Sequence, residues 1–206
     1  MHLAIIAGIA VTGCAVALGN VSRAAEPAPV ASMPTPAVGD VLVYKNNFVT
    51  VACSRWQITA TNQNGFIVSR CGDDTAYYKA SNGALVRITD KRGDDLVSFK
   101  PFSPSIQFPL QVGKSWKGTY SGVTTADESA WDSVQSCKVI DWETVQVPAG
   151  AMPAFRIDCT DNWTSSGYAG TSSNTSWYSP EAHALVKVLD VGQPKWNMEL
   201  VSYTVH

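Results

Sequence analysis

Side chains that could perform acid–base or nucleophilic chemistry are few in this chain. It has three histidines, and two of them are His2, next to an apolar N-terminal run, and His206, the last residue. A Ser-His-Asp or Cys-His site would therefore depend on His183. His183 falls in a predicted hairpin turn, and histidine is among the non-glycine residues enriched at positive φ. We interpret it as a turn residue, so the inventory disfavours a nucleophilic enzyme and assigns no catalytic residue.

Paired carboxylates could support glycoside hydrolysis, in which one carboxylic acid protonates the leaving group and the other carboxylate activates a water molecule or attacks the sugar itself. Adjacent acidic doublets in this chain lie at predicted turns, where neighbouring side chains point apart. The better candidates are Asp158 and Asp161, which lie close to Cys159 and Trp163. A carboxylate-dependent hydrolase is therefore the enzymatic alternative.

The seven tryptophans offer a different chemistry, because aromatic rings can stack on a sugar or line an apolar pocket. Trp116, Trp131 and Trp163 have the most polar sequence neighbours, so we expect these three nearest the surface and name them as the ligand-binding candidates. The ligand classes they predict are apolar molecules and carbohydrates.

Four cysteines lie in the body of the chain: Cys53, Cys71, Cys137 and Cys159. An even number of cysteines predicts disulfides where the chain is exported, which the N-terminal residues described next indicate. Because each successive pair flanks a predicted hairpin, we predict the bonds Cys53–Cys71 and Cys137–Cys159. Zinc is the rival, but the chain has no CxxC spacing or histidine cluster, and it has no phosphate-binding or dinucleotide motif. We predict no metal and no cofactor.

Residues 1–24 predict an export signal. Residues 3–18 are almost wholly apolar, a run shorter than the roughly 20 residues of a membrane-spanning helix, and a small-x-small cleavage site follows. The alternative is a lipoprotein signal that ends at residue 13, with the lipid on Cys14. Residues 25–38, rich in alanine and proline, would form a linker before a single domain at 39–206. Both alternatives predict an exported protein that is periplasmic, anchored to the outer membrane or secreted.

The charge of the chain narrows the range of partners. The net charge is −2 and the sequence pI is about 5.9, without a basic stripe. This disfavours binding to nucleic acid. Contact with a membrane is expected only through the lipid anchor.

The candidate residues must be positioned by β-strands. Ser, Thr, Val and aromatic residues are plentiful, and long runs of Leu, Glu, Lys and Ala at helical spacing are missing. Short strands at regular spacing predict an all-β fold, an antiparallel meander of about ten strands that is curled or barrel-like. Segments 77–88 and 177–188 share a pattern of two aromatic residues, five variable positions, Ala-Leu-Val, a basic residue and a β-branched residue. Asn82-Gly83 predicts a two-residue turn that would pair Tyr78 with Arg87. We therefore predict two related halves.

Three further motifs lie in the second half, at 108–116, 147–155 and 177–181. They read Phe-Pro-Leu followed by Val-Gly-Lys-Ser-Trp, Val-Pro-Ala-Gly followed by Ala-Phe, and Trp-Tyr-Ser-Pro-Glu. Over residues 108–188 the chain resembles a broad group of exported bacterial proteins of unknown function. The resemblance implies a long antiparallel meander and an exported location, and it implies no catalytic residues.

These observations together predict a bacterial envelope or secreted β domain that acts by binding or as a structural component. One alternative is a carrier that holds a lipid or another apolar ligand in a curved sheet. Others are a carbohydrate-binding module and the carboxylate-dependent hydrolase.

Overall fold

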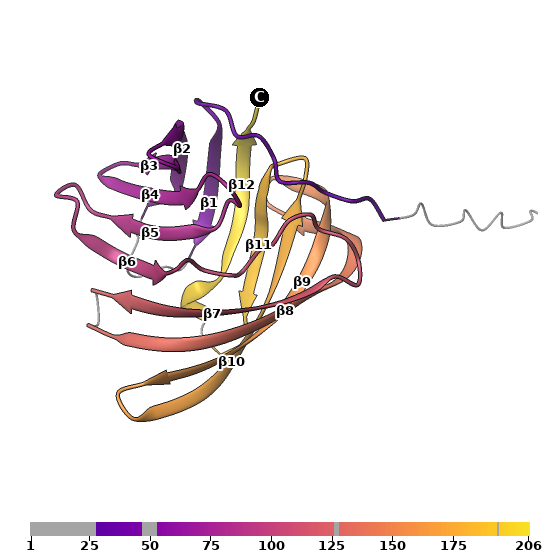
Figure 1. Ribbon diagram of the computed structural model, residues 1–206. Helices are drawn as coiled ribbons and strands as arrows, with labels where there is room; N and C mark the ends of the chain where they lie inside the picture. The colour runs from indigo at the N-terminus through magenta and orange to yellow at the C-terminus, as the bar shows by residue number, and fades with distance from the viewer. Residues whose placement is uncertain (1–27, 47–52, 126–127, 193) are drawn as a thin grey trace, which may run out of the picture.

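The chain forms a closed antiparallel barrel, described by a computed structural model over residues 28–46, 53–125, 128–192 and 194–206 (Figure 1). Each strand pairs with the next along the sequence, and the first strand pairs with the last. The predicted all-β meander is confirmed, with twelve strands in the described residues rather than about ten. No helix in these segments has the length and apolar character needed to cross a membrane.

The strands differ in length, and β8 and β9 are the longest. Their bounds are β1 Val41–Asn46, β2 Arg55–Gln63, β3 Phe66–Cys71, β4 Asp74–Lys79, β5 Leu85–Thr89, β6 Asp95–Lys100, β7 Ser115–Thr124, β8 Ala130–Val147, β9 Gly150–Ser165, β10 Tyr168–Ser179, β11 Ala184–Asp190 and β12 Met198–Thr204, with a 3-10 turn at Pro194–Trp196.

Both predicted disulfides are present. Cys137 and Cys159 stand directly opposite each other on β8 and β9, with their Cα atoms 4.1 Å apart. Cys53 precedes β2 and bonds to Cys71 at the end of β3, across a Cα–Cα distance of 5.8 Å. Each bond therefore closes across one hairpin, as the position of the cysteine pairs around the predicted hairpins indicated.

The predicted register of the first repeated hairpin is wrong, because Arg87 stands opposite Tyr77 and not opposite Tyr78. Tyr78 pairs with Leu85 and Tyr77 with Arg87, because Val86 is an extra residue in β5. A two-residue type I′ turn needs positive φ at both central residues, but at 82–83 only the glycine has it, with φ 70°. The chain instead forms a four-residue loop at 80–83, closed by a hydrogen bond from Lys79 N to Ala84 O at 2.9 Å. The two-residue Asn-Gly turn occurs between β2 and β3, where Asn64 and Gly65 have φ of 54° and 83°.

The second repeated hairpin has the same shape. Trp177 pairs with Lys187 and Tyr178 with Leu185, again with a register shift between them. Its loop also has four residues, and it ends at His183 with φ 55°, where the first copy has glycine. The interpretation of His183 as a turn residue is confirmed. The two copies thus share loop length, a left-handed residue and a bulge, so the likeness extends beyond sequence.

A long connection between β6 and β7, residues 101–114, lies against the core; we call it the strap. β6 pairs only with the second half of β7, from Ser121 onward. Prolines at the strap's start and within it cannot donate ladder hydrogen bonds, so the chain leaves the sheet. In Figure 1 the strap runs from the end of β6 across the barrel to the start of β7. Leu110, within the strap, enters the core and is completely buried.

The segment before β1 is docked on the strap. Ala31 exchanges two backbone hydrogen bonds with Leu110, at 2.9 and 2.7 Å, and is itself buried. The predicted linker covers residues 25–38, and in its described part Ala31 packs on the strap. The predicted signal, Cys14 and the start of the linker lie outside the described residues.

Two apolar clusters hold the barrel together. The first joins the strap to β7–β10 and includes Leu110, Phe155, Ile157 and the disulfide of Cys137. The second lies at the tip of the β8–β9 hairpin, where Ala149 N donates to Leu200 O of β12 at 3.0 Å. Because β11 and β12 pair over only two residues, contact with this tip helps to hold β12 in the barrel.

Candidate functional site

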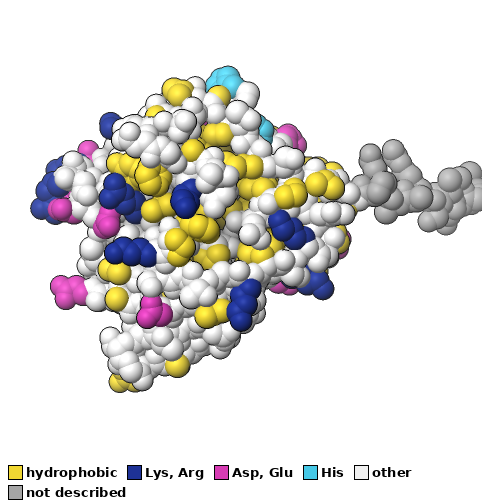
Figure 2. Space-filling model, viewed as in Figure 1, with side chains coloured by type: hydrophobic (Ala, Val, Ile, Leu, Met, Phe, Trp, Pro, Cys, Tyr) yellow, Lys and Arg dark blue, Asp and Glu magenta, His cyan; other side chains and the backbone are white. Residues whose placement is uncertain are grey.

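A pocket of about 530 Å³ lies between the strap and the barrel wall, and we call it the strap pocket. Four segments meet there: residues before β1, the β4–β5 loop, the strap and the start of β7. Figure 2 shows apolar side chains gathered in the middle of this face, with Lys and Arg side chains around them. The lining residues are Ser32, Met33, Ser81, Asn82, Phe102, Pro104, Ile106, Gln107, Phe108, Pro109, Trp116, Lys117 and Gly118.

Aromatic rings form the wall of the strap pocket. Trp116 belongs to the core cluster with only 9% of its surface exposed, so the expectation that it lies at the surface is wrong. Phe108 packs edge-on against Tyr178 of β10, with ring centroids 5.2 Å apart. Burial raises the pKa of Tyr178 above its ordinary value, so the phenol stays neutral beside these rings. The aromatic wall of the pocket is therefore held in place by the core behind Trp116 and by Tyr178 beside Phe108.

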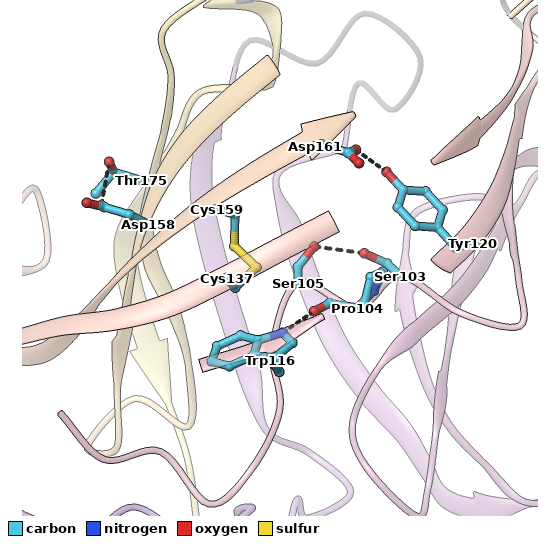
Figure 3. The surroundings of a disulfide bond; sticks show 10 residues. All are labelled: Ser103, Pro104, Ser105, Trp116, Tyr120, Cys137, Asp158, Cys159, Asp161 and Thr175. Carbon is cyan, nitrogen blue, oxygen red and sulfur yellow. Dashed lines mark hydrogen bonds between the residues drawn. A yellow bond between two sulfur atoms is a disulfide. The ribbon is translucent and has the colours of Figure 1, made fainter. Parts of the chain in front are cut away.

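Three contacts hold the strap at its position. The Trp116 indole Nε1 donates to Pro104 O at 2.7 Å (Figure 3). The ring of Pro104 lies directly on Gly118, where an added Cβ would be 2.5 Å from the proline Cβ. Lys114 Nζ donates to the carbonyl oxygens of Gln107 and Pro109 at 2.6 and 2.7 Å, and burial lowers the pKa of Lys114. The pocket is thus built into the fold.

The other two candidate tryptophans do not share this pocket. Trp131 pairs with Gly122 and Trp163 pairs with Gly170, and each ring lies flat over the glycine of the neighbouring strand. Trp131 also lines a shallower depression of about 420 Å³ together with the exposed Tyr168 at the β9–β10 turn. The three predicted tryptophans therefore form no common stacking platform.

Asp161 lies in a buried hydrogen-bonded cluster. It accepts from Tyr120 Oη at 2.5 Å and from Ser133 Oγ at 2.7 Å. Burial and the bond to Asp161 raise the pKa of Tyr120 to about 12, while hydrogen bonds from Trp131 and Ser133 oppose the shift. The Asp161 carboxylate is therefore used to tie β7, β8 and β9 together.

Asp158 points away from this cluster. It lies three residues before Asp161 on β9, so the two side chains are on opposite faces of the strand. Asp158 accepts from Thr175 Oγ1 at 2.9 Å (Figure 3). It also pairs with Arg156. The two carboxylates do not converge on a common cleft, and the arrangement needed for glycoside hydrolysis is not formed by them.

The described segments contain no group of three or more His, Cys, Asp or Glu side chains that could hold a metal ion. Sequence reasoning found Trp116 but missed the other walls of the strap pocket, Phe102, Ile106, Phe108 and Met33. A signal was present, because aromatic residues alternate with prolines in the strap, and such a segment cannot continue a strand.

No protein-family model matches the chain, and no curated protein sequence matches it. Two solved structures are similar to it. One is a candidate lipoprotein from Parabacteroides distasonis, 13% identical with a TM-score of 0.49, over 85% of this chain and 100% of that chain. The other is a candidate exported protein with a YmcC-like fold from Bacteroides fragilis, 10% identical with a TM-score of 0.46, over 84% of this chain and 99% of that chain. At these identities the similarity concerns the overall fold alone.

Proposed function

We propose that this is an exported protein that binds an apolar ligand in the strap pocket without catalysing a reaction. The observation that carries the proposal is the pocket itself: about 530 Å³, walled by Trp116, Phe102 and Phe108. Ligand pockets in proteins are commonly 300–1,000 Å³ and lined mainly by apolar and aromatic side chains. Export is supported by the apolar N-terminal run and by two disulfides, which persist in oxidising compartments.

A purified sample tests this proposal with N-phenyl-1-naphthylamine, a neutral apolar probe whose fluorescence increases in a dry site. We expect saturable binding at one site per chain. Ile106→Trp, inside the pocket, and Ser81→Trp, at its exposed edge, should each weaken binding at least about tenfold, or about 1.4 kcal/mol. Val123→Trp places the same ring in the other depression and should leave binding unchanged.

The two pocket variants are compared only if their thermal unfolding midpoints match that of the parent. Ser81 is exposed, so its substitution is not expected to disturb the fold. Absence of saturable binding would refute the proposal. Loss of binding in Val123→Trp alone would move the site to the depression beside Trp131.

A further inference from the structure

We propose that the strap pocket receives an extended polypeptide segment, which adds a short strand to a free edge of β7. The inference rests on the proposed function and names the class of its ligand, a peptide with apolar side chains at two alternate positions. It depends on the main-chain groups of β7 that face the pocket and on the apolar side chains beside them.

The main-chain groups of β7 alternate between two neighbours. Thr124 N donates to Ser129 O in the register of β7 with β8, so the even-numbered residues of β7 bond to β8. Successive residues of an antiparallel strand direct their N–H and C=O groups to opposite sides. The odd-numbered residues therefore point to the side of β6, and the bond from Thr125 N to Leu96 O follows this rule.

The first half of β7 has a free edge on that side. β6 pairs with β7 only from Ser121 onward, so Ser115, Lys117 and Thr119 direct their main-chain groups at an uncovered stretch. No hydrogen bond within the described segments uses these groups. At about 3.4 Å per residue the stretch is roughly 17 Å long, which is the length of an added strand of about five residues.

The strap pocket lies beside this free edge. It is lined by Trp116, Lys117 and Gly118 of β7 and by Ser81 and Asn82 of the β4–β5 loop. In the barrel β4 and β5 follow β6, so this loop lies beyond the β6 side of β7. The side chain of Lys117 is exposed on the face of β7 opposite Trp116 and Gly118. The part of Lys117 directed at the pocket is therefore its main chain.

A strand added at this edge would place alternate side chains in the pocket. Residues directly opposite each other in an antiparallel pair share a face of the sheet. Two peptide residues opposite Trp116 and Gly118 would therefore point inward, toward the apolar strap residues Phe102 and Ile106. The residue between them would exchange main-chain hydrogen bonds with Lys117. The recognised pattern is apolar–x–apolar, and sheet edges bind extended peptides in this way, with main-chain bonds for affinity and pockets for alternate side chains.

The edge favours a separate peptide over the chain's own strands or a second copy. The added strand would continue the position that β6 occupies along β7, but β6 ends at Lys100 and Pro101 has no N–H to donate. Two copies of the chain joined edge to edge around Lys117 would place like charges opposite each other, which destabilises a cross-strand pair.

The test uses the peptide acetyl-Thr-Val-Thr-Val-Thr-amide. Calorimetric titration into the purified protein should show one site per chain, and the peptide should displace N-phenyl-1-naphthylamine. Methylation of the central threonine nitrogen removes the donor to Lys117 O and should weaken binding at least about tenfold. The permuted peptide acetyl-Thr-Thr-Val-Val-Thr-amide should bind more weakly by a similar factor, because adjacent valines point to opposite faces of a strand.

Two variants separate the main chain of Lys117 from its side chain. Lys117→Pro removes the N–H at the free edge, a place where strands tolerate proline, and should abolish peptide binding. Lys117→Met keeps the N–H and should bind the peptide as the parent does. The variants are compared only if their thermal unfolding midpoints match that of the parent, and the methylated peptide makes the same test without changing the protein.

The inference would be overturned, while the apolar site remains, if the three peptides bound equally or if a protein that binds the probe bound none of them. A dimer in sedimentation that Lys117→Pro dissociates would also overturn it, because the edge would then be occupied by a second copy. Failure of the probe to bind at all would overturn the proposed function instead.

Discussion

The contact between the strap and β7 can be tested with one methyl group. Gly118 lies beneath Pro104, and an alanine Cβ would lie 2.5 Å from the proline Cβ and 2.9 Å from its Cγ. Both distances are shorter than real Cβ contacts allow, and Pro104 cannot retreat easily because Trp116 Nε1 holds its carbonyl oxygen at 2.7 Å. Gly118→Ala must therefore push the strap away from the barrel wall.

Two effects set the size of the change in stability. Overpacking of a well-packed site typically costs about 1–3 kcal/mol. Replacement of a strand glycine by alanine returns about 0.5–1 kcal/mol, because the unfolded chain loses freedom. The φ of Gly118 is not positive, so no backbone strain is added. We expect a net loss of about 1–2 kcal/mol in the free energy of unfolding.

Urea unfolding measures this loss as a lower midpoint with an unchanged slope. The second variant is Pro104→Gly, which removes both ring atoms that meet the new methyl group. In that background Gly118→Ala should be neutral or stabilising, so the double-mutant cycle should give a coupling of about 2 kcal/mol. The probe affinity of Gly118→Ala alone should fall, because the strap forms one wall of the pocket. The close contact between Gly118 and Pro104 would be refuted if Gly118→Ala were as stable as the parent, or if the effects of the two substitutions on stability simply added up.

Three further predictions concern the framework around the pocket. Replacing Cys137 and Cys159 together by alanine should lower the free energy of unfolding by about 3 kcal/mol relative to the oxidised parent. Urea unfolding of both proteins measures this loss, and under reducing conditions the difference between them should disappear. Tyr120→Phe should cost about 2 kcal/mol by leaving a buried carboxylate with one donor fewer. Because the folded-state pKa of Tyr120 is raised from 10.0 to about 12, its contribution is present below pH 10 and is lost as the pH rises toward 12; a parent protein and variant with identical alkaline unfolding curves would contradict this. In the repeated hairpins, Gly83 and His183 both have positive φ. Gly83→Ala should lower the stability of the protein by about 1 kcal/mol, and His183→Gly should raise it by about the same amount. Thermal unfolding midpoints that shift in the opposite directions would show that the positive φ values are not required.

The expected exposure of Trp116 was wrong for a reason that the sequence itself contains. Its neighbours Ser115 and Lys117 are polar, and this suggested a polar environment. In a strand, however, adjacent side chains point to opposite faces, so polar neighbours indicate that the ring between them points to the core. The same alternation separates Asp158 from Asp161, which are three residues apart and lie on opposite faces.

The register of the repeated hairpins could not be read from Asn82-Gly83. The same dipeptide forms a two-residue turn at Asn64-Gly65 and part of a four-residue loop at 80–83. The surroundings of the two sites differ, because a Cβ built on Gly83 would lie within 4 Å of Met33 and Phe108, whereas a Cβ built on Gly65 would have no neighbour within that distance. The dipeptide by itself therefore does not distinguish the two turns.

The sequence alone determined the strand character, the antiparallel meander, the two disulfides and the likeness of the two repeated hairpins, because each depends on patterns within a strand or a single hairpin. Only the tertiary structure decided the closure of the sheet, the docking of the segment around Ala31 and the strap pocket. The pocket brings together residues from 32–33, 81–82, 102–109 and 116–118. No local pattern encodes their meeting, because it follows from how the strap leaves the sheet and packs across a barrel that closes between its first and last strands.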